Sequence, residues 1–299
     1  MTDEPWSPGS GFAVVDKPEG VTSYKLIASL GRRLGDRVKC GHAGTLDSFA
    51  SGVLVCLFGR YTRLSDYFMG AGKGYEASVR FGEETDTLDP EGSVVATAPV
   101  PSLEALEAAL PAFRGDILQA PPAYSAVHVD GERAYERALR GEDVKPALRP
   151  VTIRSLELLS YEGGVARLRV SCTKGTYIRS LARDLALACG SRGRLSALRR
   201  TFSGPFTAEA AVRADAFGPD SLRFLSEPDA RGLNLGVVRL AGEEAHAFSN
   251  GLPLFRLSTF AGLAGQGPVV AFDEAGRLLG VVSRASGAWR YSFVLGGEV

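Results

Sequence analysis

The feature that most limits how this chain can fold is a strict alternation of apolar and polar residues in two separate segments. In residues 74–82 (GYEASVRFG) and again in residues 165–173 (VARLRVSCT), almost every second side chain is apolar. Because successive side chains of a strand point to opposite faces, each segment predicts a strand with one buried and one solvated face. Such strands are typical of antiparallel sheets.

The rest of the chain adds more strands than helices. Residues 53–58 (VLVCLF) are either a buried strand or a short apolar helix end, a choice that periodicity alone leaves open. Further strands are expected at 12–18 and 151–161, and helices at 22–34, 102–113, 134–141 and 175–190. We therefore expect an α+β fold with a mixed, largely antiparallel sheet.

A second, smaller unit is expected at the C-terminal end. The segment 226–236 (SEPDARGLNLG) is polar, carries Pro and Gly, and is typical of a linker. Beyond it, short strands surround one helix and an EAG turn, as in a small β-rich module. The expected domains are residues 10–232 and residues 236–297.

Charge and composition narrow the class of protein. The 34 basic and 34 acidic residues cancel, but they are segregated: residues 25–39 and 192–200 are basic, and residues 83–91 are acidic. Basic blocks of this kind are either solvated surfaces or contacts to a polyanion. The chain has no run of about 18 apolar residues, no signal-like start and four cysteines without CxxC pairing. We expect a cytoplasmic protein without a membrane span.

Asp47 is the most informative single residue. It stands in GHAGTLDSFASGVL (41–54), directly before the apolar run and without nearby metal-ligand residues. One interpretation is a helix N-cap, a position that aspartate favours. The other is a nucleophile, which would need a cation beside it, because burial alone would protonate the carboxylate. The residues themselves leave both interpretations open.

Three other side chains carry the same ambiguity. Tyr75 lies on the apolar face of its strand, so it either packs in the core or stacks on a nucleobase at a pocket rim. Arg179 opens a helix, where its charge opposes the macrodipole, so it is either a solvated surface residue or the partner of an anion. His42 by itself is only a weak indication of a functional site.

Several segments together resemble the bacterial TruB-type tRNA pseudouridine synthases. The resemblance covers nearly the whole chain, and its end, from VRLAGEEAHAF onward, resembles the small PUA-type RNA-binding module. The matching segments are VDKPEGVTSYK (15–25), GHAGTLDSFASGVL (41–54), KGYEASVRFGEETDTLDPEG (73–92), QAPPAYSAVHVDGERAYERALRGE (119–142), CTKGTYIRSLARDLA (172–186) and LSALRRTFSGPF (195–206). Two departures flank Asp47: Ala43 replaces a frequent threonine and Ser48 a usual proline.

The resemblance implies an isomerase that converts uridine 55 in the TΨC arm of tRNA to pseudouridine, with no cofactor and no metal. It implies that Asp47 is the nucleophile, attacking either C1′ or C6. Arg179 would keep Asp47 charged, and Tyr75 would stack on the extruded base. Leu198 would pack on the other side of the base.

The resemblance also assigns the RNA contacts. His42 would fill the gap that the flipped base leaves in the RNA, and Lys17 and Pro18 would support the wall of the substrate-binding site. Residues 119–145 would form a mobile RNA-gripping insertion, which we call the 119–145 lobe. With the basic stretches 25–39 and 192–200, it would contact phosphates, so that binding weakens with salt.

Two alternatives remain. A guide-RNA-dependent relative would need protein partners and would lack an insertion like the 119–145 lobe. An RNA chaperone without chemistry would not need Asp47, Tyr75 and Arg179 together. We therefore expect a stand-alone, monomeric enzyme that needs neither a guide RNA nor a partner protein.

Overall fold

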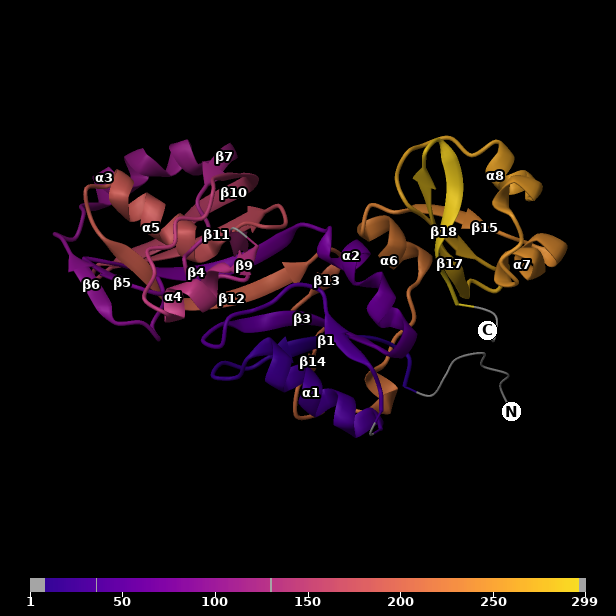
Figure 1. Cartoon of the computed structure of the whole chain (residues 1–299). Helices are drawn as coiled ribbons and strands as arrows, with labels where there is room; N and C mark the ends of the chain where they lie inside the picture. The colour runs from indigo at the N-terminus through magenta and orange to yellow at the C-terminus, as the bar shows by residue number, and fades with distance from the viewer. Residues whose placement is uncertain (1–8, 36, 130, 296–299) are drawn as a thin grey trace.

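The structure is a computed structural model that describes residues 9–35, 37–129 and 131–295, and it contains a ten-stranded sheet and a four-stranded sheet (Figure 1). The larger sheet has the order β14-β1-β3-β12-β4-β11-β10-β7, with β13 and β2 paired beside β12 and β3. Its strands are β1 (Gly11–Lys17), β2 (Cys40–His42), β3 (Ser51–Phe58), β4 (Lys73–Phe81), β7 (Gly115–Gln119), β10 (Arg149–Glu162), β11 (Val165–Cys172), β12 (Gly193–Ser203), β13 (Phe206–Thr207) and β14 (Val212–Arg213).

The strand pairing confirms the predicted fold class. The two segments with alternating residues, β4 and β11, pair antiparallel, and β10 joins β11 across Gly163–Gly164. The sheet is mixed because β3 runs parallel to β12 and β1 runs parallel to β14. The ambiguous segment 53–58 is strand, since it belongs to β3.

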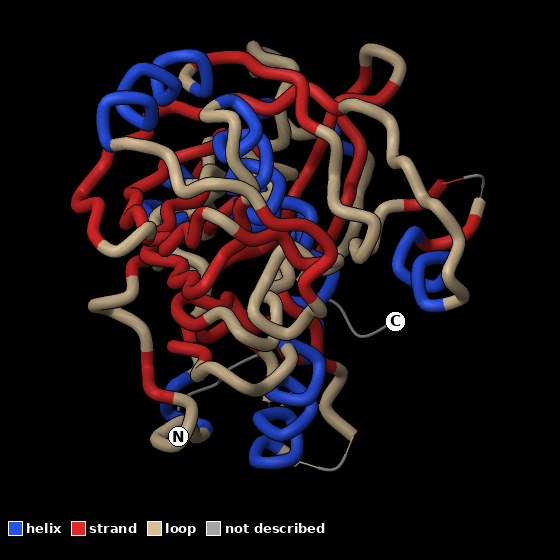
Figure 2. The backbone as a smooth tube through the Cα atoms, turned by 90° about the vertical axis from the view of Figure 1, so that its left-hand side faces the viewer, coloured by secondary structure: helices blue, strands red, loops and turns tan. Residues whose placement is uncertain are grey.

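Helices lie around the strands of the large sheet (Figure 2), and side chains of α1 and α5 belong to its apolar clusters. The longer ones are α1 (Ser23–Leu34) and α5 (Ile178–Ala188), and α3 (Leu103–Ala109) is continued by the 3-10 turn η2 (Leu110–Phe113). The apolar stripe of α5 packs on the buried face of β4, β11 and β12. Helix α1 starts where expected, because the Thr22 hydroxyl caps it by accepting a hydrogen bond from the Lys25 N–H. Helix α5 starts later than the predicted residue 175, at Ile178.

The four-stranded sheet forms the small β-rich unit at the C-terminal end (Figure 1). One of its faces shares an apolar cluster with β1, β3 and the short helix α2 (Ser65–Met69), and the other is covered by α7 and α8. Its elements are β15 (Gly236–Arg239), α7 (Gly242–Ser249), η4 (Leu254–Arg256), α8 (Ser258–Ala261), β16 (Val269–Phe272), β17 (Leu278–Ala285) and β18 (Ala288–Val294). The last two residues of the expected domain, 296 and 297, lie outside the described residues.

The expected linker at 226–236 is not an open connection. It forms helix α6 (Glu227–Gly232), which begins with a capping box between Ser226 and Asp229. Ala230 and Leu233 are buried in the apolar cluster between the two sheets. The polar residues that indicated a linker are the capping residues of a short helix.

The basic stretch 192–200 is not a free cationic surface either. All of it except Arg192 lies in the strand β12, where Arg194 pairs with Glu83 and Arg199 pairs with Asp16. Arg200 is only 1% exposed. The prediction that this stretch supplies phosphate contacts from the surface is therefore wrong for Arg200, and Arg199 is occupied by an internal ion pair.

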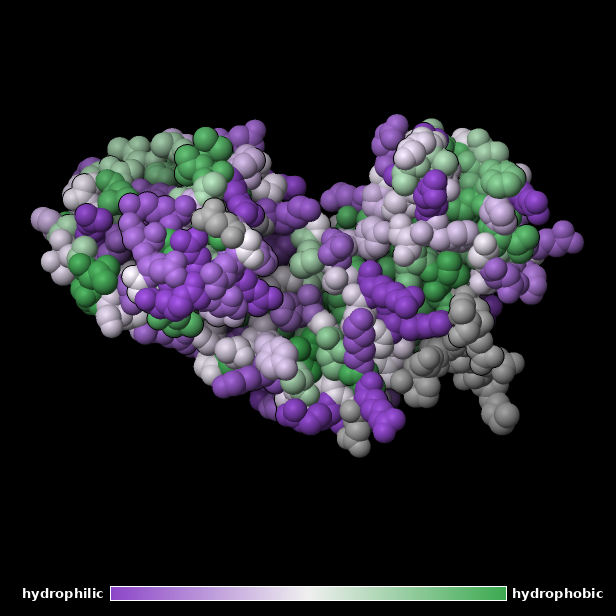
Figure 3. All heavy atoms as spheres, in the orientation of Figure 1, coloured by the Kyte–Doolittle hydropathy of each residue, from purple (hydrophilic) through white to green (hydrophobic). Residues whose placement is uncertain are grey.

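The 119–145 lobe contains a short hairpin and one helix. Its elements are β8 (His128–Val129), β9 (Glu132–Arg133) and α4 (Ala134–Leu139). Ala134, Ala138 and Val144 form its own small apolar cluster. Hydrophilic side chains gather over α4 on the face shown in Figure 3. Other short elements lie elsewhere in the chain: η1 (Gly59–Leu64), α2 (Ser65–Met69), β5 (Glu83–Thr85), β6 (Val94–Thr97) and η3 (Pro219–Ser221).

No helix among the described residues is long and apolar enough to cross a membrane.

Candidate active site

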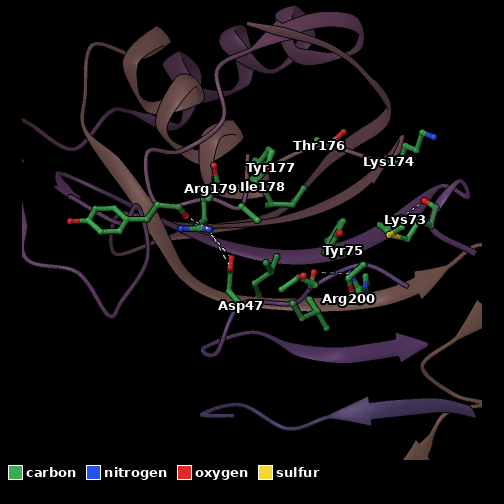
Figure 4. Close-up of a pocket in the computed structure, with 18 of the residues that line it drawn as sticks. Asp47, Lys73, Tyr75, Lys174, Thr176, Tyr177, Ile178, Arg179 and Arg200 are labelled. Atoms are coloured by element: carbon green, nitrogen blue, oxygen red, sulfur yellow. Dashed lines mark hydrogen bonds and ion pairs between the residues drawn. The ribbon is translucent and has the colours of Figure 1, made fainter. Parts of the chain in front are cut away.

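A cavity of about 940 Å³ opens between the loop before β3, the start of α5 and the 119–145 lobe (Figure 4). Its floor is made by strand pairing: β4 and β12 run antiparallel, with Tyr75 opposite Arg200 and Ala77 opposite Leu198. Because alternate residues share a face, Leu198 and Arg200 both point toward the side that Tyr75 occupies. The lining residues that matter below are Asp47, Lys73, Tyr75, Tyr124, Arg179, Leu198 and Arg200.

The loop that carries Asp47 is anchored on both sides of the carboxylate. Leu46 and Phe49 are buried in the same apolar core as α5. The buried Ser23 hydroxyl accepts a hydrogen bond from the Leu46 N–H and donates one to the Leu46 carbonyl. The chain then enters β3 rather than a helix, so the N-cap interpretation of Asp47 is wrong.

Arg179 meets Asp47 side on. Its Nε lies 2.9 Å from Oδ2 of Asp47, and its Nη2 lies 3.2 Å from Oδ1. One hydrogen bond from Nη2 and an ion-pair contact at Nε thus engage both carboxylate oxygens, which restrains the orientation of the carboxylate as well as its charge. The expected contact between the acid of the 41–47 loop and a guanidinium of the 175–190 segment is present (Figure 4).

The guanidinium of Arg179 has further partners that hold it in place. Its Nη1 lies 3.4 Å from Oδ2 of Asp89 and donates to the Thr87 carbonyl, while its Nη2 donates to the Tyr124 carbonyl. Arg179 is only 7% exposed, so the solvated-surface interpretation is wrong. Arg179 therefore joins three segments: the Asp47 loop, the loop after β5 and the 119–145 lobe.

The cavity shifts the pKa of the acids and bases in it. Although 35% of the Asp47 side chain is exposed, burial of its carboxyl raises its pKa above the usual 3.8. Arg179 opposes this shift, and the charge of Asp89 adds to it. Burial also raises the pKa of the Tyr75 hydroxyl and lowers the pKa of Lys73 to about 8.

Not all predicted site residues line the cavity. The Lys17 side chain is fully buried, and its Nζ donates to the carbonyls of Pro18 (2.9 Å), Val21 (2.7 Å) and Ser48 (3.3 Å). Lys17 thus supports the backbone of the Asp47 loop through the Ser48 carbonyl. Pro18 contributes its main-chain carbonyl, which accepts another of these hydrogen bonds.

His42 lies apart from the main cavity. It ends β2 and borders a separate hollow of about 520 Å³ beside α1. Burial lowers the pKa of its imidazole, and its Nδ1 has no hydrogen-bond partner among the described residues.

The structure adds residues that the sequence reasoning did not single out. Asp89 is 4% exposed and holds Arg179 from the side opposite Asp47. Lys73 and Arg200 form the far end of the cavity (Figure 4). A signal for Asp89 was available in the TDTLD segment, and a signal for Arg200 in its i, i+2 spacing from Leu198.

Chemically, the site offers an ionisable carboxylate oriented by a guanidinium, with an aromatic ring beside it and an aliphatic side chain near by. A carboxylate held this way can act as a nucleophile or as a base. The cavity is large enough for a flat ring such as a nucleobase to enter next to it.

The fold occurs in solved structures of complexes that contain Cbf5 and Nop10. A chain of a Cbf5–Nop10–Gar1 complex superimposes with a TM-score of 0.69 at 24% identity, covering 95% of this chain and 83% of that one. A chain of the archaeal box H/ACA Nop10–Cbf5 complex gives a TM-score of 0.69 at 22% identity, covering 99% and 92%. At such low identities the similarity shows the fold alone.

Sequence comparison gives the family. The TruB family pseudouridylate synthase N-terminal domain matches residues 32–178. A tRNA pseudouridine synthase B of Aromatoleum aromaticum is 44% identical over 276 residues, which are 91% of this chain and 87% of that protein. One of Arthrobacter is 40% identical over 292 residues, 93% of this chain and 94% of that protein. The chain belongs to the TruB family of pseudouridylate synthases, and so it is an isomerase.

Proposed function

We propose that this enzyme converts uridine to pseudouridine at position 55 in the TΨC arm of tRNA, with Asp47 as the nucleophile. The observation that carries the proposal is the ion pair between Asp47 and Arg179, which engages both carboxylate oxygens inside a cavity lined by Tyr75. The relatives named as tRNA pseudouridine synthase B support tRNA as the substrate.

The reaction is an internal rearrangement. The bond from C1′ of the ribose to N1 of uracil breaks, the ring turns, and a bond from C1′ to C5 forms. C5 loses its proton and N1 gains one, so atoms and electrons balance without an oxidant or reductant. Asp47 attacks either C1′ or C6, and in both cases it must be ionised, which is the role we assign to Arg179.

The remaining site residues bind and expose the base. A uridine within a folded arm must be flipped out, at a cost of a few kcal/mol. We assign Tyr75 and Leu198 to its two sides. His42, which lies outside the cavity, would fill the gap left in the RNA rather than touch the flipped base, and Lys17 with Pro18 would support the Asp47 loop.

The larger organisation follows the same proposal. Residues 10–232 would be the catalytic domain, with the 119–145 lobe gripping the RNA, and residues 236–297 a PUA-like RNA-binding domain. The enzyme would act as a monomer without a guide RNA or a partner protein. The cytoplasmic location stays a prediction.

The test is tritium release from tRNA that carries [5-³H]uridine, measured without a guide RNA or an added cofactor. We expect release by the wild type and none by Asp47→Asn, with tRNA binding retained. Asp116→Asn is the matched control, because this exposed carboxylate bonds only to Thr152 among the contacts seen and lies away from the cavity.

Each other outcome points to a different conclusion. Release by Asp47→Asn at the wild-type rate would remove Asp47 from the mechanism. Release that appears only with a guide RNA would favour the guide-dependent alternative. Binding without release by the wild type would favour the RNA chaperone.

A further inference from the structure

Arg200 combines near-complete burial with a place on the cavity wall. It is 1% exposed, yet it lines the cavity that also contains Asp47. Burying a guanidinium is costly unless polar groups surround it. The hydrogen-bond partners of Arg200 therefore indicate which part of the site its buried guanidinium stabilises.

Three hydrogen bonds of the Arg200 guanidinium go to main-chain carbonyls on either side of Asp47, and a further one joins it to the Tyr75 side chain. Nε donates to Val53 (2.6 Å), Nη1 to Thr45 (3.4 Å) and Nη2 to Gly44 (3.0 Å). The first carbonyl belongs to β3, after the loop, and the other two come before Asp47. One side chain thus ties together the two ends of the segment that presents the carboxylate.

This geometry suits arginine and does not suit lysine. A guanidinium presents five donors in a rigid planar fork, so it can reach carbonyls in different directions at once. An ammonium at the end of a lysine is a compact group that cannot span the same two chain segments in this way. A lysine at position 200 would keep the charge and lose some of these hydrogen bonds. We call the set of bonds from Arg200 to the Gly44, Thr45 and Val53 carbonyls the Arg200 clamp.

Two glycines allow the backbone of this segment to approach Arg200 and Lys73 closely. Gly52 has φ +102°, and a Cβ atom there would lie 2.2 Å from the Arg200 carbonyl oxygen. Gly44 has φ +101°, and a Cβ atom there would lie 3.3 Å from Cε of Lys73. Both positions require a residue without a side chain, which lets the loop pass close to Arg200 and Lys73.

We infer that Arg200 is a positioning residue: it holds the 44–53 segment so that the Asp47 carboxylate stays in register with Arg179. The inference rests on the proposed function, in which Asp47 is the reacting group. A shift of about 1 Å in a reacting group can slow an enzyme about a hundredfold. Arg200 does this without touching Asp47 itself in any contact that we observe.

The test compares Arg200→Lys with Arg199→Lys. Arg199 is the matched control, because it is the neighbour on β12 whose side chain pairs with Asp16 on the other face of the sheet. For each variant, the single-turnover rate at saturating tRNA, the tRNA affinity, the unfolding midpoint and the pH dependence of the rate are measured. Arg199→Lys should change the saturating rate less than about twofold.

For Arg200→Lys we expect a rate loss of about tenfold or more with unchanged tRNA affinity. The acid limb of its pH–rate profile should move to higher pH. The reason is that Arg179 lowers the pKa of Asp47, so a carboxylate that drifts from Arg179 keeps its proton longer. Substitution of a residue with only a structural role would not shift the acid limb of the pH–rate profile.

A second variant tests the clamp chemically. Arg200→Ala should be slow, and free guanidinium ions at millimolar concentration should restore part of the rate, since the vacated space opens into the cavity. Ethylammonium, which lacks the planar fork, should not restore it.

Two results would overturn the inference. One is Arg200→Lys with a wild-type rate and an unmoved acid limb. The other is a rate loss that only follows a lowered unfolding midpoint, with no shift of the limb and no rescue. Activity of Asp47→Asn would instead overturn the proposed function, so the two failures are distinguishable.

Discussion

The Asp47 loop and the 119–145 lobe both line the cavity, but they are held in different ways. The loop is fixed from beneath by buried side chains, namely Lys17, Ser23 and Arg200, which bond to its backbone. The lobe is attached mainly through its first residues: α5 donates to the Ala120 carbonyl from Ser180 and Arg183 and to the Tyr124 carbonyl from Arg179. Its own core is the small cluster of Ala134, Ala138 and Val144.

Under the proposed function, this difference separates two tasks. A carboxylate that reacts must be held within a fraction of an ångström, and buried hydrogen bonds to the loop backbone provide that. A segment that closes over RNA must move, and few buried contacts allow it. Substitutions beneath the loop should therefore change the rate or the stability, and substitutions in the lobe should change tRNA affinity.

The largest expected effect is on stability, at the strand that follows the loop. Gly52→Ala places a Cβ atom 2.2 Å from the Arg200 carbonyl oxygen at φ +102°, and it should lower the free energy of unfolding by about 3 kcal/mol. Gly115→Ala, at the start of the strand that leads to the lobe, has φ +82° with nothing within 4 Å and should cost about 1 kcal/mol. Urea unfolding measures both. Equal costs would show that the approach of β3 to β12 is not tight.

The next effect is on the pH dependence of the reaction. The charge of Asp89 raises the pKa of Asp47, so Asp89→Asn should move the acid limb of the single-turnover rate to lower pH. The sign follows because the proposed reaction needs the ionised carboxylate, and removing a neighbouring negative charge makes ionisation easier. Glu91→Gln should shift the limb in the same direction by less, since its charge contributes less than that of Asp89.

The rate at high pH provides the control for this experiment. Asp89 also holds Arg179, so Asp89→Asn is expected to lower the plateau as well, whereas Asp116→Asn should change neither plateau nor limb. A limb that moves to higher pH in Asp89→Asn would mean that Asp89 acts on Asp47 mainly by orienting Arg179.

Local sequence patterns predicted the strands and helices that a single segment of the chain determines. The alternation in 74–82 and 165–173 gave two central strands, and the helix expected at 22–34 is α1 (Ser23–Leu34). Helix α6 was missed because Ser226 and Asp229, read as linker residues, form a capping box in which each satisfies backbone or side-chain groups of the other. These polar residues suit a linker as well as a capped helix. The burial of Ala230 and Leu233 in the structure is what favours the helix.

The site was predicted less completely, for a physical reason. The contact of Asp47 with Arg179 joins residues 132 positions apart, and it was expected from the family resemblance rather than from spacing. Arg200 was read as part of a basic surface because a strand's register decides which of its residues are buried. Here the pairing of Tyr75 with Arg200 turns the guanidinium inward, and Arg199 outward.

The smallest expected effect is in the lobe. Val144→Ala removes two methyl groups from its cluster and should weaken the local packing by about 1 kcal/mol. Because the lobe is expected to bind RNA and not to orient Asp47, tRNA affinity should fall a few-fold, while the rate at saturating tRNA stays unchanged. Leu139→Ala is the control, since this α4 side chain is 71% exposed and leaves the cluster intact. A lower saturating rate for Val144→Ala would show that the lobe also positions the reacting groups, through the bond from Arg179 to the Tyr124 carbonyl. The two sides of the cavity would then act as one unit, and the division between positioning and binding would be wrong.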